Sequence, residues 1–241
     1  MRLITVGGVI AYRALFNWTT PSMYVGTLLV GPVFQLLFFA FLGRQLGVAD
    51  DGFYIVGNAV LAASALCLFG GTMAVSNERR FGTLGNVLLS PRSKTVIFLG
   101  RALPYAGNGL IVAAFTLVVG TLMLGLKVPS GAWGGLFLTL AVASLSASFF
   151  GLVLGSIGLR YNDVWLISNS TVAIMILLSG TVVPREQLPA VLRVVGDYLP
   201  LTHAANAARE LVGGASLGGV APQLLAEFGI GLGYAGVAGV L

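Results

Sequence analysis

Charged residues are scarce in this chain of 241 residues. They make up 9% of it, against roughly 25% in an ordinary soluble domain, while hydrophobic residues make up 57%. So few charged side chains cannot cover the surface of a soluble domain of this length. The composition therefore predicts an integral membrane protein and leaves no room for a soluble catalytic domain.

Reactive and metal-binding side chains are almost absent as well. The chain has one cysteine, Cys67, and one histidine, His203. A single thiol cannot form an internal disulfide, and a lone histidine without ligands at metal spacing is typical of a packed or capping residue. The hydrolase motifs Gly-x-Ser-x-Gly and His-Glu-x-x-His are missing, as is the phosphate-binding Gly-x-x-x-x-Gly-Lys-[Ser/Thr] loop. We therefore expect a non-catalytic chain that holds no metal or cofactor and takes energy from another polypeptide or an ion gradient.

What the sequence does contain is a series of long apolar runs. A helix needs about 20 residues to cross roughly 30 Å of hydrocarbon. The runs are continuous and rich in Leu, Ala, Val and Gly, whereas a β-barrel would show short alternating segments. The expected fold is all-α, with one transmembrane domain over residues 1–241. Its six spans are expected at about 23–43, 54–76, 97–126, 132–159, 164–183 and 220–241.

Basic residues are unevenly distributed between the segments that join these spans. With the amino terminus inside, the cytoplasmic segments hold eight basic residues against two acidic ones, Glu78 and Asp163, whereas the outer segments hold five of each sign. Basic residues concentrate on the cytoplasmic side of membrane proteins. We therefore expect a multi-pass protein of the cell membrane with both termini in the cytosol. The net charge of +5 then reflects topology, and no nucleic-acid partner is expected.

The first 22 residues differ from the spans. An apolar stripe at helical spacing, with side chains suited to the headgroup region, predicts an interfacial helix over 1–22; the alternative is a disordered start. The stripe is Leu3, Val6, Ile10 and Ala14, and the headgroup residues are Arg13, Asn17 and Trp18. Because Arg13 interrupts the apolar run, no cleavable targeting peptide is expected. Thr20 before Pro21 is typical of a helix start and marks the first span.

Residues 77–96 form the longest charged stretch between the first and last spans. Four basic residues, with Arg101 just beyond, stand there against a single acid, Glu78, so the loop is expected to face the cytosol. The loop also contains glycine, threonine and proline at positions typical of turns and helix ends. A loop that only anchors the protein by its positive charge would not need them. A short helix from about Thr83 to Leu89, stopped before Pro91, would present Leu84, Val87 and Leu88 to a partner.

Several motifs of this chain resemble those of the membrane subunits of ABC exporters of the type-two class, which includes drug and polysaccharide exporters. In the loop they are Glu78-Arg79-Arg80-Phe81-Gly82-Thr83-Leu84, Leu88-Leu89-Ser90-Pro91 and Gly100-Arg101. After the fifth span they are Ser179-Gly180-Thr181-Val182-Val183-Pro184, Leu188-Pro189, Leu199-Pro200-Leu201-Thr202 and Ala208-Arg209. The resemblance covers nearly the whole chain. It departs at Gly85, where the family often has an acid.

The resemblance implies a role for the loop 77–96. In that family the short helix is the coupling helix, which sits in a cleft of a separate ABC ATPase that binds ATP and magnesium. The residues that would serve this contact are Glu78, Arg79, Arg80, Gly82, Thr83, Leu84, Val87, Leu88 and Pro91. The alternative is an ordinary solvated loop anchored by its positive charge.

The outer segment 184–214 contains apolar pieces broken by Pro184, Pro189 and Pro200, each too short to cross a membrane. Such pieces are tolerated at membrane depth only when they pack against protein or line water. We therefore expect re-entrant or interfacial helices over the outer end of a path, as the resemblance also implies. A folded lid without a transport role is the alternative.

Polar side chains within spans are costly and mark functional positions. The resemblance puts spans two and five at the central path of a dimer, where methionine, phenylalanine and aliphatic residues would supply an adaptable lining. The expected path residues are Asn58, Phe69, Thr72, Met73, Asn169, Val172, Met175, Ile176 and Ser179. The alternative for the polar ones is hydrogen bonding between helices, worth about 0.6 kcal/mol on average.

Small residues elsewhere predict close helix packing. In span four they are Ser144, Ser148, Gly151 and Gly155, and in span six Gly229, Gly233 and Gly236. Glu227 in span six is expected to be a shallow carboxylate paired near the outer interface; the alternative is a proton or cation site.

Two functions remain open. The favoured one is the permease subunit of an ATP-driven exporter of hydrophobic or amphipathic compounds, such as a drug, a lipid or a lipid-linked glycan. Its partners would be an ABC ATPase, a second copy or a similar permease, and membrane lipid. The other is an autonomous ion-coupled carrier or channel that uses Glu227.

Overall fold

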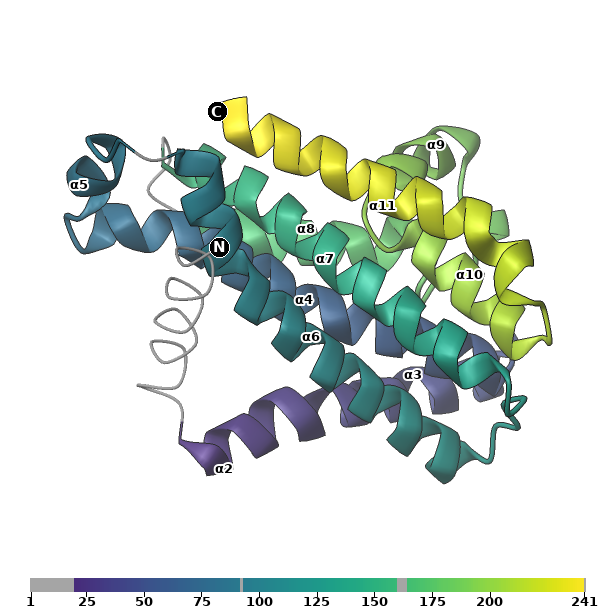
Figure 1. Cartoon of the computed structure of the whole chain (residues 1–241). Coiled ribbons are helices and arrows are strands. Elements are labelled where there is room, and N and C mark those ends of the chain that lie inside the picture. Colours follow the sequence, from purple (N-terminus) through teal and green to yellow (C-terminus); the bar gives the residue numbers. More distant parts are fainter. Residues whose placement is uncertain (1–19, 92, 160–163, 241) are drawn as a thin grey trace.

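The computed structural model describes residues 20–91, 93–159 and 164–240, which contain helices and no strand (Figure 1). The expected all-α membrane fold is thereby confirmed. The expected interfacial helix over 1–22 falls almost entirely outside the described residues. The elements in order are α2 (Pro21–Met23), the π-helix η1 (Tyr24–Val30), α3 (Gly31–Leu46), α4 (Asp51–Arg80), α5 (Leu84–Leu88), α6 (Lys94–Leu124), α7 (Ala132–Gly158), α8 (Val164–Leu178), the 3-10 helix η2 (Arg185–Gln187), α9 (Ala190–Tyr198), α10 (Thr202–Val212) and α11 (Leu217–Val240).

Five helices of the described chain are long and apolar enough to cross a membrane. They are Tyr24–Leu46, Asp51–Arg80, Val96–Leu124, Ala132–Gly158 and Leu217–Val240. The first begins as expected, because Thr20 Oγ1 accepts a hydrogen bond of 3.3 Å from the amide of Met23. The second begins at a similar cap, where the Asp50 carboxylate accepts from the amide of Phe53 at 3.1 Å.

The expected fifth span, 164–183, is helical only as far as Leu178. At 1.5 Å per residue its 15 residues reach roughly 22 Å, short of the hydrocarbon thickness. Gly180 has a φ of 75°, a left-handed conformation that ends a helix. Hydropathy did not show this ending, since Val182 and Val183 continue the apolar run beyond it.

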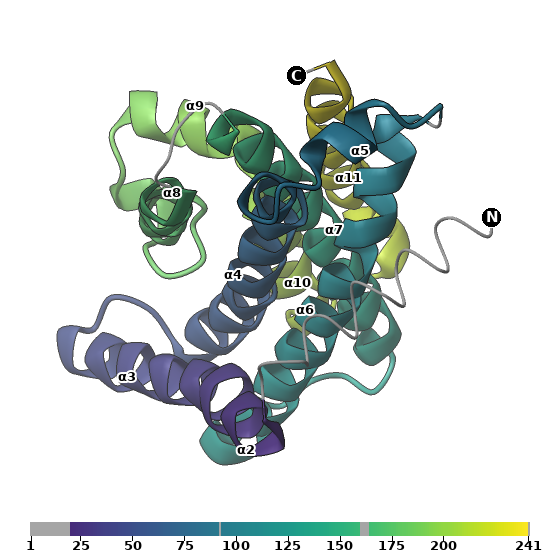
Figure 2. The same cartoon turned by 90° about the vertical axis from the view of Figure 1, so that its left-hand side faces the viewer.

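Helix α4 is the centre of the molecule and packs most extensively against α7 and α6. Figure 2 shows α3 and α8 on one side of α4, and α6, α7 and α11 on the other. The α4–α7 contact is made by backbone. A Cβ on Gly71 would lie 2.5 Å from the carbonyl oxygen of Ser148, and one on Gly151 would lie 2.6 Å from that of Leu68. The small-residue packing expected for span four is therefore confirmed.

The glycine face expected for span six is wrong. Within the described chain, a Cβ on Gly229, Gly233 or Gly236 would meet nothing within 4 Å. The close approach uses Gly231 instead, where a Cβ would lie 3.0 Å from Cα of Ser146 in α7. Spacing identified a row of small residues on one face of α11. The rotation of α11 about its axis turns a different face, the one with Gly231, towards α7.

The segment after α8 folds back onto the helices. Helix α10 packs against α7, α4 and α11, and six of its eleven residues are buried. Its first turn is held by Glu227 of α11, whose carboxylate accepts hydrogen bonds from the amides of Leu201 at 2.9 Å and Ala204 at 3.3 Å. Glu227 is fully buried, deeper than expected, and its partners are the unpaired amides of a helix start.

Arg209 ties the far end of α10 to the end of α8. Its guanidinium donates to the carbonyl oxygens of Gly180 at 2.7 Å and Thr181 at 3.2 Å, and lies 3.8 Å from the ring centre of Phe53. Burial lowers the pKa of Arg209 to about 10, partly offset by Glu186 and Asp50. The side chain is therefore charged at neutral pH, and it satisfies carbonyls that the end of α8 leaves unpaired.

The α4–α7 contact predicts a test of stability. Gly71→Ala places a methyl group against the backbone of α7 and should destabilise the protein by about 1–3 kcal/mol. Gly107→Ala is the matched control, because Gly107 lies in α6 with open space at its Cβ and alanine favours a helix. Thermal unfolding of both variants in detergent checks this, and equal midpoints would contradict the backbone contact.

Candidate functional site

A cavity of about 530 Å³ lies between the first span, α4 and α8. Its walls are mainly apolar. From the first span they comprise Thr27, Leu28, Gly31, Pro32 and Gln35; from α4 Asn58, Leu61, Ala62, Ala65, Leu66 and Phe69; from α6 Val112; and from α8 Trp165, Val172 and Ile176. We call this cavity the groove. An apolar pocket of this size with few polar groups is typical of a site for a small molecule.

Four of the nine expected path residues lie on the groove: Asn58, Phe69, Val172 and Ile176. Among the α4 residues that line the groove, Asn58 is the one with a polar side chain. Its amide nitrogen donates to the carbonyl oxygen of Tyr54 at 2.9 Å, and its amide oxygen lies 3.5 Å from the amide nitrogen of Gln35. The two amides give the apolar groove a pair of fixed hydrogen-bonding groups.

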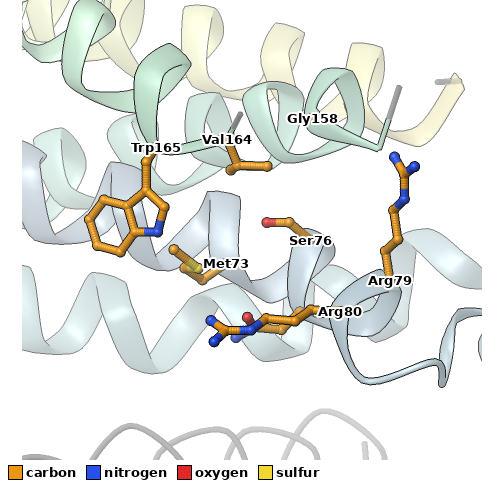
Figure 3. A pocket seen from close by; sticks show the side chains of 8 residues that line it. Met73, Ser76, Arg79, Arg80, Gly158, Val164 and Trp165 are labelled. Atoms are coloured by element: carbon orange, nitrogen blue, oxygen red, sulfur yellow. The ribbon is translucent and has the colours of Figure 1, made fainter. Parts of the chain in front are cut away.

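A second cavity of about 340 Å³ lies at the end of α4, next to the loop that carries α5 (Figure 3). We call it the mouth. It is lined by Met73, Ser76, Asn77, Arg79, Arg80, Gly158, Val164 and Trp165. In Figure 3 the Arg79 side chain extends towards the end of α7, and it donates a hydrogen bond to the carbonyl oxygen of Leu159. Met73, expected on the path, lies here.

The other four expected path residues lie on neither cavity. Thr72 is buried at the α4–α7 contact, where its hydroxyl lies 2.7 Å from the carbonyl oxygen of Leu68 and 3.2 Å from that of Gly151. Met175 is buried in the core. Ser179 is buried and bonds the carbonyl oxygen of Met175 and the hydroxyl of Thr181. The contact of Thr72 with Gly151 favours the alternative of a hydrogen bond between helices, whereas Met175 and Ser179 are packed within the protein.

Asn169 is exposed on α8, and its amide nitrogen donates to the carbonyl oxygen of Trp165 at 2.8 Å. It lies outside both cavities, on a surface that no other part of the described chain covers. An exposed amide at mid-helix is costly against lipid. This position therefore suits contact with protein or water.

Most of the lining residues were not among the expected path residues, and two of them, Gln35 and Trp165, make direct contacts with expected ones. Gln35 is the partner of Asn58, and Trp165 lines both cavities, with its ring centre 5.4 Å from that of Phe69. Gln35 could have been found, because it interrupts the apolar run of the first span. Trp165 had no such signal, since an aromatic residue at a span end is equally typical of an interfacial anchor.

The loop 77–96 is braced by Glu78. Its carboxylate forms an ion pair with Arg101 of α6 and accepts a hydrogen bond of 2.6 Å from the hydroxyl of Thr83. Thr83 precedes α5 as expected, but its hydroxyl bonds Glu78 and does not cap the helix. Gly82 has a φ of 71°, which a side chain would strain, and so allows the turn between α4 and α5. Glu78, Gly82 and Thr83 thus shape the loop.

The surface that α5 presents differs from the expected one. Val87 is only 9% exposed and turns inwards, because the braced loop folds back on the chain and removes this apolar side chain from water. Leu84 is half-buried, and the backbone of Leu88 ends the helix. The large apolar side chains that project are Phe81, 71% exposed, and Leu89, 86% exposed, with Pro91 also exposed.

No group of three potential metal-ligating side chains occurs among the residues that the structure places. Cys67 is buried at the α4–α6 contact, where its sulfur lies 3.4 Å from the carbonyl oxygen of Tyr105. Cys67 is therefore part of the packed core.

Comparison with known proteins gives the context of these features. Residues 8–212 match the family model described as ABC-2 type transporter. The chain is 29% identical over 143 residues to the probable multidrug ABC transporter permease YbhR of Escherichia coli (strain K12). The aligned residues make up 58% of this chain and 38% of YbhR. It is 27% identical over 204 residues to the daunorubicin resistance ABC transporter permease protein DrrB1 of Streptomyces coeruleorubidus. That alignment covers 80% of this chain and 70% of DrrB1. The match thus spans well under half the length of YbhR. The family model, by contrast, matches most of this chain, and the chain therefore belongs to the ABC-2 type transporter family.

Proposed function

We propose that this chain is the permease subunit of an ATP-driven exporter of hydrophobic or amphipathic compounds. Family membership and the names of the two relatives support this role. The observation that carries it is the groove, which joins an apolar lining to the amide pair of Gln35 and Asn58. A lining of this kind accommodates apolar compounds of different shapes while offering a few fixed polar contacts.

Two permease chains would enclose the transport path. The groove lies between the first span and α8, the two elements that stand apart from the packed body in Figure 2. Asn169 and Ser170 are exposed on α8. Because polar side chains are costly against lipid, a second copy or a similar permease is the partner that this surface favours.

A separate ABC ATPase would supply the energy, with ATP and magnesium bound on that partner. The surface proposed to enter its cleft is α5 with its flanks, where Phe81, Leu84 and Leu89 offer apolar contacts. We place this loop in the cytosol because basic residues concentrate around it, and both termini on the same side. Exposed apolar side chains in a cytosolic loop are typical of a protein contact.

An ion-coupled carrier that uses Glu227 has little support from the geometry. The Glu227 carboxylate is occupied by two backbone amides, and Glu227 lines neither the groove nor the mouth. A proton or cation that binds there would have to displace the first turn of α10. The structural role of Glu227 is therefore the simpler interpretation.

The docking surface can be tested by adding charge to it. Leu84→Asp and Leu89→Asp should each weaken association with the ATPase at least about tenfold, since burial of an unpaired carboxylate at an interface costs more than ~1.4 kcal/mol. Ser130→Asp adds the same charge in the α6–α7 loop, at the other end of the molecule from α5 in Figure 1. Co-purification and ATP turnover are the measurements, and equal association in all three variants would count against docking at α5.

The groove can be tested by filling it. Val172→Trp should reduce the volume available to a compound and alter the range of compounds that stimulate ATP turnover. Leu122→Trp is the control, because Leu122 is 77% exposed on α6 and lies outside both cavities. If the two variants show the same compound profile as the parent, the groove is not the path.

The energy source separates the exporter from the carrier. The purified chain alone should show no ATP hydrolysis, and reconstitution with its ATPase should give ATP-driven transport. Glu227→Gln keeps an acceptor oxygen for the Leu201 amide and should retain most of that activity, whereas Glu227→Leu leaves both amides unpaired and should lower thermal stability. Proton-driven transport by the chain alone, abolished in Glu227→Gln, would establish the carrier instead.

A further inference from the structure

The groove and the mouth lie along one face of α4. Seven of the eleven α4 residues that line them recur at intervals of three and four, as neighbours on one helical face do: Asn58, Ala62, Ala65, Phe69, Met73, Ser76 and Arg80. Trp165 of α8 lines both cavities and contacts Phe69. The two cavities therefore adjoin at Trp165 and follow each other along the helix.

The two ends of this face differ in charge. No charged side chain among the residues that the structure describes lines the groove. The mouth is lined by Arg79 and Arg80 and by no acidic residue among those described. Glu78, the acid nearest in sequence, is paired with Arg101 and Thr83. The positive charge of the mouth is thus uncompensated by the described side chains that line it.

The two arginines are held differently. The Arg79 guanidinium bonds the carbonyl oxygen of Leu159, which fixes its position beside the end of α7. Arg80 is exposed, and the described residues offer it no hydrogen bond or ion pair. In Figure 3 its side chain extends beside Met73. A guanidinium with free donors is suited to a carboxylate, sulfate or phosphate group.

We infer that the mouth and the groove form one binding site for an acidic amphiphile, with its anionic head against Arg80 and its apolar part along Trp165 and Phe69. The inference rests on the proposed export function and names the class of its cargo. Eleven residues separate Phe69 from Arg80, or roughly 16 Å along the helix, so the apolar part must be extended. A cationic amphiphile would meet like charge at the mouth.

The occupant is cargo and not a resident phospholipid, because four of the expected path residues line the groove. A lipid held permanently there would block it. The site also combines a charged group at one end with fixed amides, Gln35 and Asn58, at the other. This difference in polarity between the two ends orients the compound. Its apolar part enters first from the cytoplasmic side, and its anionic head stays at the mouth.

Fluorescent probe binding tests the inference without the ATPase. The full chain in phosphatidylcholine nanodiscs is titrated with dansyl-undecanoic acid and with its methyl ester, which has the same apolar part without the charge; empty nanodiscs correct for partition into lipid. The acid should bind more tightly than the ester. Arg80→Gln should weaken acid binding by about 5-fold, as expected for an exposed ion pair, and leave ester binding unchanged.

Three controls isolate the contact. Arg80→Lys should restore most of the acid affinity, because it keeps the charge. Lys127→Gln removes a positive charge from the α6–α7 loop and should have no effect. Trp165→Ala should weaken binding of acid and ester alike, because it removes an apolar wall that both share. Equal affinity for acid and ester, or equal losses in Arg80→Gln and Lys127→Gln, would overturn the inference.

A change of lipid separates cargo from resident lipid. Nanodiscs that contain phosphatidylglycerol should still bind the acid at the site; loss of all probe binding there would identify the occupant as an anionic phospholipid and refute the cargo assignment. Because these measurements need no ATPase, they are independent of the export test. Charge-selective binding without ATP-driven transport would contradict the proposed function and leave the binding site in place.

Discussion

The backbone contact between α4 and α7 is the constraint on which the other features depend. Gly71 and Gly151 let the two helices touch without intervening side chains, and Thr72 adds a hydrogen bond across the contact. One side of α4 is thereby occupied by the packed body. Its other side, which carries Phe69 and Met73, is left to face α8 and the first span. In a membrane, where the hydrophobic effect does not drive helices together, such close packing is a main source of association.

The return segment after α8 is held by polar groups that the helix ends require. Glu227 meets the amides at the start of α10, and Arg209 meets the carbonyls where α8 stops. Both residues carry ionisable side chains in apolar surroundings, where burying a polar group is costly unless hydrogen bonds satisfy it. Their partners here are backbone groups, so the same bonds that satisfy the side chains also position α10 against α4 and α7. This bracing fixes the end of α8 at Leu178, and with it the wall that α8 forms.

The sequence was sufficient for the fold class, the long spans and the position of α5, because length and turn residues are properties of a single segment. It was insufficient where the answer depends on the rotation or tilt of one helix against another. Gly229, Gly233 and Gly236 form as good a small-residue stripe as the one in span four, yet Gly231 makes the contact. Thr72 and Asn58 are equally polar residues of α4, yet only Asn58 lies on a cavity. Gln35 is visible in the sequence as a polar residue in an apolar run, but its pairing with Asn58 depends on how two helices meet.

Consecutive residues at the α5 end of α4 serve different parts of the molecule. Glu78 binds Thr83 beside α5 and Arg101 of α6, whereas Arg79 reaches the end of α7 and Arg80 lines the mouth. They belong to a single helical turn, so any force on α5 acts on the turn that shapes the mouth. A rigid helix then carries that displacement towards Phe69 and the groove. In the proposed exporter, a docked ATPase could change the shape of the path only through elements of this kind, which have contacts at both ends.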